Sequence, residues 1–206
     1  MAYDVDRRPG QWVSEQAARK SLHVWLLAAL LVAIALAAVA LLASNRATIA
    51  SSVVVIVAAL VLKRYADREV VTAIRWLGGA RAEASVGEEL NTLRSEAFVV
   101  MHDIKPRGEG NIDHVVSGPT GVFLVETKER RYEDRHLVIA KRQAAKIHDE
   151  LGVWVTPVIC IHRRRGRPFK THGVWIVPQP CLLDWIREQR NSPVEFERLA
   201  RYADGL

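Results

Sequence analysis

Cysteine is scarce in this sequence, which has only two among its 206 residues, Cys160 and Cys181. Two cysteines at this separation make neither a disulfide framework nor a metal-binding pair, which favours a reducing compartment. The seven histidines are scattered without an HExxH or other paired spacing, so the sequence predicts no zinc site. Low-complexity tails are missing as well, and 50% of the residues are apolar, which excludes an intrinsically disordered chain.

Charge is absent from one long stretch, residues 22–43, which reads LHVWLLAALLVAIALAAVALLA. As a helix it would extend ~33 Å at about 1.5 Å per residue, enough to cross a hydrocarbon core of ~30 Å. A cleavable signal peptide is an alternative, but its apolar part is only about 7–15 residues long and would begin nearer the N-terminus. A buried core helix is another, although a run that is apolar on all sides suits lipid better. The sequence therefore predicts a transmembrane helix.

A second apolar run, residues 47–62, follows a short polar connector. It would extend only ~24 Å, so this span is short or borrows flanking residues. We expect the two runs to form a transmembrane helical hairpin within residues 22–65. Cations flank its outer ends, with Arg7, Arg8, Arg19 and Lys20 before it and Lys63, Arg64 and Arg68 after it, against Arg46 alone in the connector. The positive-inside rule then predicts an inner-membrane protein with both termini in the cytoplasm.

The rest of the chain has the composition of a folded domain. We divide the sequence into an N-terminal segment (1–21), the hairpin (22–65), a linker helix (66–84) and a domain (85–206). Periodicity predicts helices over 67–84, with a break at Gly78-Gly79, and over 86–95, 141–151, 181–190 and 193–202, the last capped by Ser192. Strands are expected over 98–104, 111–117, 121–128, 136–140, 155–162 and 173–177. This order predicts an α/β fold in which helices flank a mixed β-sheet.

The segment GNIDHVVSGPTGVFLVETK, residues 110–128, carries the candidate chemistry. A symmetric turn centred between Pro119 and Thr120 pairs residues whose numbers sum to 239. Asp113 then faces Glu126, and Lys128 shares their side because side chains two apart on a strand point the same way. A slip of one residue would turn Asp113 to the other face. His114 points to that other face and is interpreted as a core or surface histidine.

Two close carboxylates repel each other and favour a bound divalent cation, and oxygen ligands favour Mg²⁺ or Mn²⁺ over Zn²⁺. Such a cation can polarise a phosphoryl oxygen and activate water, while a nearby lysine orients that water. The alternative is an ordinary salt bridge between Lys128 and one of the carboxylates on a solvated face. The charge pattern alone leaves both interpretations open.

Asp113, the Glu126-Thr127-Lys128 triplet and the surrounding GPTGVFLVETK resemble the nuclease-related domain, a branch of the PD-(D/E)xK nuclease superfamily, over about residues 85–203. The resemblance implies a restriction-endonuclease-like core and metal-dependent hydrolysis of phosphodiester bonds. It implies Asp113 and Glu126 as Mg²⁺ ligands and Lys128 as the residue that assists the attacking water. It also implies catalytic roles for Glu88, in the pair Gly87-Glu88, and for Gln143. Ser85-x-x-Glu88 equally fits a capping box at a helix start.

Basic residues gather in two places that fit a polyanionic partner: Arg163, Arg164, Arg165, Arg167 and Lys170 in one, and Arg130 and Arg131 in the other. Phosphate contacts give affinity without sequence preference, so we expect nucleic acid as a partner, with DNA favoured over RNA. A solvated loop, or contact with an anionic lipid leaflet, is the alternative. The leading hypothesis is a membrane-anchored, Mg²⁺-dependent nuclease. The alternative is a catalytically inactive module at the membrane that binds nucleic acid or protein.

Overall fold

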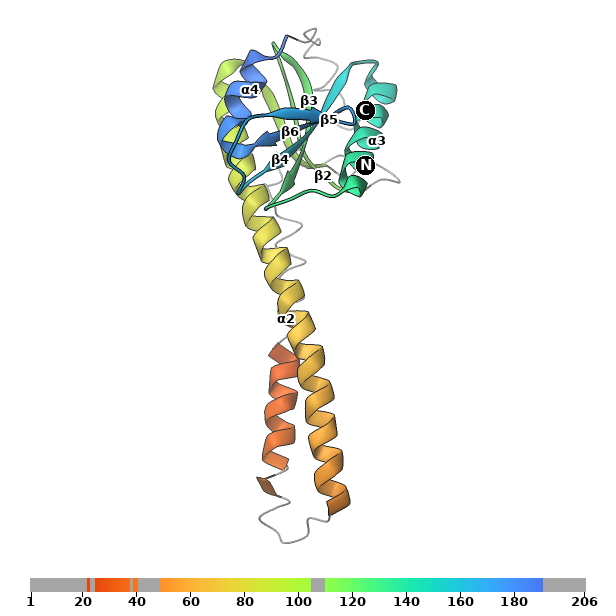
Figure 1. Cartoon of the computed structure of the whole chain (residues 1–206). Coiled ribbons are helices and arrows are strands. Elements are labelled where there is room, and N and C mark those ends of the chain that lie inside the picture. The colour runs from red at the N-terminus through yellow and green to blue at the C-terminus, as the bar shows by residue number, and fades with distance from the viewer. Residues whose placement is uncertain (1–21, 23–24, 38, 41–48, 105–109, 191–206) are drawn as a thin grey trace. The chain divides into compact units, whose positions relative to one another are not determined.

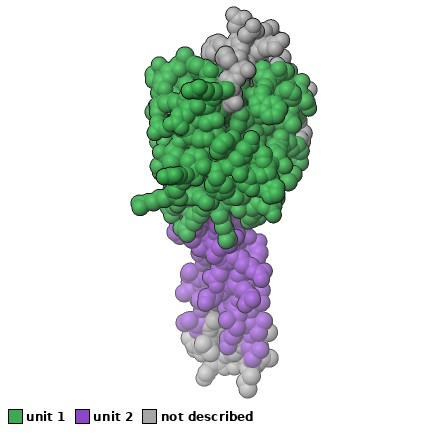
Figure 2. Space-filling view, turned by 45° about the horizontal axis from the view of Figure 1, so that its top comes forward, with its two compact units in different colours: residues 1–12, 78–206 green, residues 13–77 purple. Residues whose placement is uncertain are grey.

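The computed structural model describes residues 22, 25–37, 39–40, 49–104 and 110–190 of the chain. The chain divides into two compact units (Figure 2), one of residues 13–77 and one of residues 1–12 together with 78–206. Helix α2, Ile49–Asn91, contributes residues to both units. The predicted helix over 193–202 lies outside the described residues.

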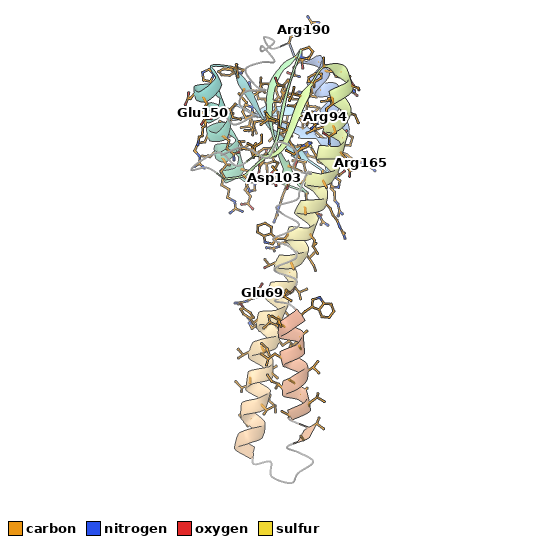
Figure 3. The ribbon with its side chains drawn as sticks, turned by 180° about the vertical axis from the view of Figure 1, so that it is seen from behind. Glu69, Arg94, Asp103, Glu150, Arg165 and Arg190 are labelled. Atoms are coloured by element: carbon orange, nitrogen blue, oxygen red, sulfur yellow. The ribbon has the colours of Figure 1, made fainter. Side chains whose placement is uncertain are left out.

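The unit of residues 13–77 is helical wherever it is described, with residues 25–37, 39–40 and 49–77 in helices. Side chains project outward from these helices (Figure 3). Many of the large apolar ones are exposed, including Leu22, Trp25, Leu26, Leu30, Leu36, Val53, Ile56, Leu60 and Val61. Among the described residues, no helix is both long enough and apolar enough to span a lipid bilayer. This result does not support the hairpin predicted over residues 22–65, part of which (23–24, 38 and 41–48) lies outside the described residues.

Helix α2 has no break at Gly78-Gly79, contrary to the sequence prediction (Figure 1). Each glycine destabilises a helix by about 1 kcal/mol relative to alanine. It still makes its backbone hydrogen bond, so a helix can continue across two glycines when the neighbouring residues favour helix. A Cβ at Gly78 would lie 2.5 Å from Glu129 Oε2, so an alanine there would require the Glu129 side chain to move. The helices expected over 67–84 and 86–95 are therefore one helix, which the 3₁₀ turn η1 (Thr92–Glu96) follows. Ser85 lies inside it, so the capping-box interpretation is wrong.

A six-stranded mixed sheet forms the centre of the other unit, in the order β1-β2-β3-β4-β6-β5. Strands β1 (Val99–Ile104), β2 (Ile112–Gly118) and β3 (Gly121–Lys128) are antiparallel neighbours. Strands β4 (Val155–Ile161) and β6 (Val174–Pro178) continue the sheet parallel to β3, and β5 (Phe169–Thr171) pairs antiparallel with β6. The sequence prediction missed only β5 among these strands, because three residues carry no usable period.

Helices cover both faces of this sheet (Figure 1). On one face α3 (Asp134–Leu151) packs through Leu137, Ala140 and Ile147. On the other face lie Leu90 at the end of α2 and Trp185 of α4 (Leu182–Glu188), which follows the short η2 turn (Gln179–Cys181). The structure thus confirms a mixed sheet flanked by helices. The strand predicted over 136–140 is wrong, since these residues form the first turns of α3.

The β2–β3 hairpin has the predicted register. The pairs run from His114–Val125 to Gly118–Gly121, and the numbers in every pair sum to 239. Gly118 is required at the turn because a Cβ there would lie 2.1 Å from Phe98 Cδ1. The hairpin is therefore fixed at its turn end, and its ladder runs as far as His114 and Val125. Beyond that pair the Thr127 N–H bonds to the side chain of Asp113.

Candidate active site

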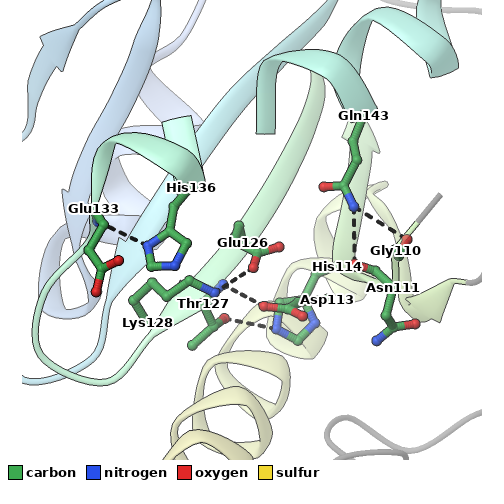
Figure 4. Close-up of polar contacts among 10 residues, drawn as sticks. All are labelled: Gly110, Asn111, Asp113, His114, Glu126, Thr127, Lys128, Glu133, His136 and Gln143. Atoms are coloured by element: carbon green, nitrogen blue, oxygen red, sulfur yellow. Dashed lines mark hydrogen bonds and ion pairs between the residues drawn. The ribbon is translucent and has the colours of Figure 1, made fainter. Parts of the chain in front are cut away.

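Asp113, Glu126 and Lys128 lie at the open end of the hairpin. Strand alternation puts them on the face of Val115 and Leu124, which is the face that α3 covers. The Thr127 backbone N–H donates a hydrogen bond of 2.7 Å to Asp113 Oδ2, and Lys128 Nζ donates one of 2.5 Å to Glu126 Oε1 (Figure 4). The hairpin therefore brings together the two carboxylates and the lysine that the sequence singled out.

The charges in this cluster shift each other's protonation. Burial raises the pKa of Asp113 well above its ordinary value, and the negative charges of Glu126 and Glu83 raise it further. Burial also opposes the charge of Lys128, but the carboxylates of Glu126, Asp113 and Glu83 outweigh this effect and raise the pKa of Lys128. The site thus holds a firmly protonated ammonium beside carboxylates that repel one another, a state that a bound cation would relieve.

Glu83 on α2 is a third carboxylate in the cluster, and the sequence prediction missed it. Its residue is only 4% exposed, and its charge acts on both Asp113 and Lys128. Glu88, the residue that the resemblance favoured, is exposed instead. The signal was present in the sequence, because residues 83, 86, 90 and 93 follow one helical stripe in which Glu83 is the only acid.

Several buried oxygen atoms near the cluster accept no hydrogen bond from the described residues: Glu126 Oε2, Gln143 Oε1 and Asn111 Oδ1. Gln143 on α3 donates through Nε2 to the carbonyl oxygens of Asn111, at 3.1 Å, and of Gly110, at 3.4 Å. These bonds hold its amide at the start of β2, and its Oε1 accepts no hydrogen bond from the described residues. Such oxygen acceptors suit a hard cation or its water ligands.

The donor set can be compared with the needs of a metal ion. In the part of the chain that the structure describes, no group of three or more His, Cys, Asp and Glu side chains is arranged to hold a metal. Structural zinc sites use four such ligands in a closed cage. Mg²⁺ is instead usually bound through one or two carboxylates and keeps several waters. Asp113 and Glu126 match this mode of coordination, because Oε2 of Glu126 accepts no hydrogen bond from the described residues and can bind the ion.

His136 is a further residue near the site that sequence reasoning missed. It lies in the first turn of α3, where its Nδ1 accepts a hydrogen bond of 3.0 Å from the backbone N–H of Glu133. Burial lowers the pKa of His136, and the positive charges of Lys128 and Arg135 lower it further. Its ring is therefore neutral at pH 7, with the proton on Nε2.

The predicted basic residues lie on two adjacent loops, except Lys170, which lies in strand β5. The backbone N–H groups of His162 and Arg163 donate to the carbonyl oxygens of Lys128 and Glu129, each at 2.9 Å, so the loop after β4 lies beside the loop after β3. Some of these cations are engaged within the protein: Arg163 and Arg130 contact Glu129 at 3.4 Å and 3.5 Å, and Arg164 lies 4.9 Å above the Phe169 ring. Exposed residues among them include Arg130, Arg131, Arg163, Arg165 (Figure 3), Arg167 and Lys170. Lys170 Nζ also lies 6.0 Å from the centre of the Trp175 ring.

Residues 78–162 match the family described as the nuclease-related domain. The match includes Glu83, Asp113, Glu126, Lys128 and Gln143, although it covers less than half of the chain.

A solved structure also resembles the chain. It is the crystal structure of a repair endonuclease from Pyrococcus abyssi, which is 19% identical with a TM-score of 0.34. The similarity covers 55% of this chain and 47% of that chain, so this chain spans about half the length of that endonuclease. No curated protein gives a significant match.

Proposed function

We propose that the chain is a metal-dependent nuclease that hydrolyses phosphodiester bonds, with DNA favoured over RNA as its substrate. One observation carries the proposal: Asp113, Glu126 and Glu83 gather with Lys128, and a buried oxygen of Glu126 is left without a hydrogen-bond partner among the described residues. The match of residues 78–162 to the nuclease-related domain supports the same function.

Asp113 and Glu126 are the residues that would hold Mg²⁺ or Mn²⁺, with Glu83 as a third carboxylate nearby. The bound cation would polarise a phosphoryl oxygen and lower the pKa of a water molecule. Lys128 keeps its proton on Nζ because its pKa is raised, so it can donate a hydrogen bond to the attacking water and stabilise negative charge on the phosphate. Gln143 Oε1 offers an acceptor that can orient water or substrate.

The two basic loops are the proposed nucleic-acid-binding surface. Hydrogen bonds from His162 to Lys128 and from Arg163 to Glu129 attach the loop after β4 to the strand end that carries the catalytic lysine. A phosphodiester backbone held by Arg165, Arg167 and Arg131 would therefore pass close to the carboxylates. Contacts of this kind give affinity without sequence preference.

We also propose that the N-terminal part attaches the chain to the inner membrane, with both termini and the nuclease-like domain in the cytoplasm. The support is the two apolar runs with their flanking cations, together with exposed apolar side chains such as Val53, Ile56 and Leu60. A cysteine placed at Asn45 should react with an impermeant reagent added outside the cell, whereas one placed at Arg8 should not. The reverse pattern would overturn this orientation.

The second candidate function is a catalytically inactive module that binds nucleic acid or protein at the membrane. Two observations favour it: Lys128 forms an ion pair with Glu126, and the described residues contain no three-ligand metal group. In that case the cluster would be a structural ion pair and the basic loops alone would act.

Cleavage of plasmid DNA and of RNA by the purified full-length chain, with Mg²⁺ or Mn²⁺, separates the two candidates. Glu83→Gln removes the buried carboxylate of α2, and Glu88→Gln removes an exposed one five residues later on the same helix. We expect metal-dependent cleavage by the wild-type chain and by Glu88→Gln, and a strong loss in Glu83→Gln. Binding without cleavage by the wild-type chain under all these conditions would favour the inactive module.

A further inference from the structure

Behind the carboxylates, on the opposite face of the sheet, lies a buried chain of polar side chains. Thr127 Oγ1 is 3.2 Å from His114 Nε2, His114 Nδ1 is 2.8 Å from His102 Nδ1, and His102 Nε2 is 3.0 Å from Asn91 Oδ1. His114 is fully buried and His102 is 4% exposed. The chain therefore runs from the strand that carries Glu126 and Lys128 through β2 and β1 to the end of α2.

The direction of every hydrogen bond in this chain follows from one end. Arg94 Nε donates to Asn91 Oδ1 at 2.9 Å, and because a guanidinium can only donate, the Asn91 atom facing it is the amide oxygen. His102 must then donate from Nε2, so with a neutral ring its Nδ1 accepts from the Nδ1–H of His114. His114 Nε2 in turn accepts from the Thr127 hydroxyl. Each proton is used once and both rings are neutral, a state that burial also favours.

The position of these residues is unusual for a core. Val100, Val116 and Val125 belong to the apolar cluster on this face, and the next inward-facing residues on the same three strands are His102, His114 and Thr127. The polar chain thus replaces three apolar side chains only at the end of the sheet that carries the carboxylates. Thr127 also links the two faces, since its backbone N–H donates to Asp113 at 2.7 Å.

We propose that Thr127, His114, His102 and Asn91 form a positioning chain for the active site. The hydrogen bond to His114 fixes the side chain of Thr127 on the back of β3, which aims its N–H at Asp113 and keeps Glu126 and Lys128 on the front. A fully satisfied polar network of this kind holds one arrangement where apolar packing would tolerate several. The inference rests on the proposed nuclease function, because its role is to hold the residues of that site.

Thr127→Val in the full-length chain tests the proposal, because valine keeps the shape and the backbone N–H but has no hydroxyl. Removing a group that orients metal ligands typically costs about 10-fold to 100-fold in activity. We expect a loss of this size in kcat, with the KM for DNA nearly unchanged and faster hydrogen exchange at the amide of residue 127. Thr127→Ser keeps the hydroxyl and should retain most of the activity. Asn91→Ala, at the partly exposed far end, should lower kcat less but in the same direction.

Val116→Ala is the matched control, since it weakens packing on the same face without touching the chain. Suppose that Val116→Ala lowers kcat as much as Thr127→Val does, for the same loss of thermal stability. The hydrogen-bonded side chains from Thr127 to Asn91 then contribute only to stability, and the proposal fails. Unchanged kcat and amide exchange in Thr127→Val and Asn91→Ala would overturn it too. If the wild-type protein cleaves no nucleic acid, the proposed function is overturned instead. The amide exchange of residue 127 would still report whether the hydrogen-bonded side chains from Thr127 to Asn91 position strand β3.

Discussion

Replacing Asp113 by asparagine should abolish cleavage and yet stabilise the folded protein. If Asp113 and Glu126 face each other at ~5 Å, an effective dielectric constant of about 20 gives a repulsion of roughly 3 kcal/mol between the two charges. Loss of the attraction to Lys128 offsets part of this gain. The asparagine Oδ1 can still accept the hydrogen bond from Thr127 N–H, so no buried donor is left unpaired. We expect a net gain of about 1–2 kcal/mol in the free energy of unfolding.

The gain should depend on pH in a defined direction. The pKa of Asp113 is raised above its ordinary value of 3.8 in the folded state, so the folded protein binds this proton more tightly than the unfolded chain. The contribution of Asp113 to stability is therefore full below that ordinary value and is lost as the pH rises through the raised pKa. The difference between Asp113→Asn and wild type should be small in acid and largest at alkaline pH.

Thermal unfolding of the full-length wild type and of Asp113→Asn, measured from acid to alkaline pH, tests this pH dependence. A gain of about 1–2 kcal/mol corresponds to a rise in Tm of roughly 2–8 °C for a protein of this size. Glu88→Gln, which removes an exposed carboxylate, should leave Tm nearly unchanged. An Asp113→Asn variant that is less stable than wild type at alkaline pH, or a difference that does not vary with pH, would refute the reasoning.

Two further predictions follow from the geometry. Gly79→Ala should stabilise the protein by up to about 1 kcal/mol, because α2 is continuous and a Cβ at Gly79 meets nothing within 4 Å. Gly78→Ala should gain less, because its Cβ would clash with Glu129. Urea unfolding of the two variants measures the difference in their free energies of unfolding. Alanine at all three of residues 163–165 should flatten the slope of log affinity for duplex DNA against log salt by up to about 2.7, or ~0.9 for each phosphate group that the variant no longer neutralises. An unchanged slope would mean that this loop does not bind nucleic acid.

The open end of the hairpin could be predicted from sequence because local signals determine it. Gly118 and Gly121 bracket a two-residue turn, and alternation along two strands then places Asp113, Glu126 and Lys128 on one face. No long-range information is needed for this step. The same logic turned His114 to the other face correctly.

The residues that sequence reasoning missed depend on contacts between distant segments. Glu83 belongs to the apolar stripe of α2, but the prediction placed it at the end of one helix, over 67–84, and began a separate helix at residue 86, so the stripe was not recognised. The hydrogen bond between His102 and His114 exists only because β1 pairs with β2 in one register, which no turn motif indicates. The start of α3 was mistaken for a strand because residues 136–140 are rich in β-branched and apolar side chains over too short a window to show a helical period.

Binding of Mn²⁺ by the full-length chain, followed by electron paramagnetic resonance of the free ion, tests the central claim most directly. If Asp113 and Glu126 form a divalent-cation site, the wild-type chain should remove Mn²⁺ from solution with a saturable stoichiometry, and Mg²⁺ should displace it. Asp113→Asn and Glu126→Gln should weaken this binding strongly, while Glu88→Gln should bind as wild type does. Equal Mn²⁺ binding by the wild-type chain and both site variants, or no binding by any of them, would contradict the account.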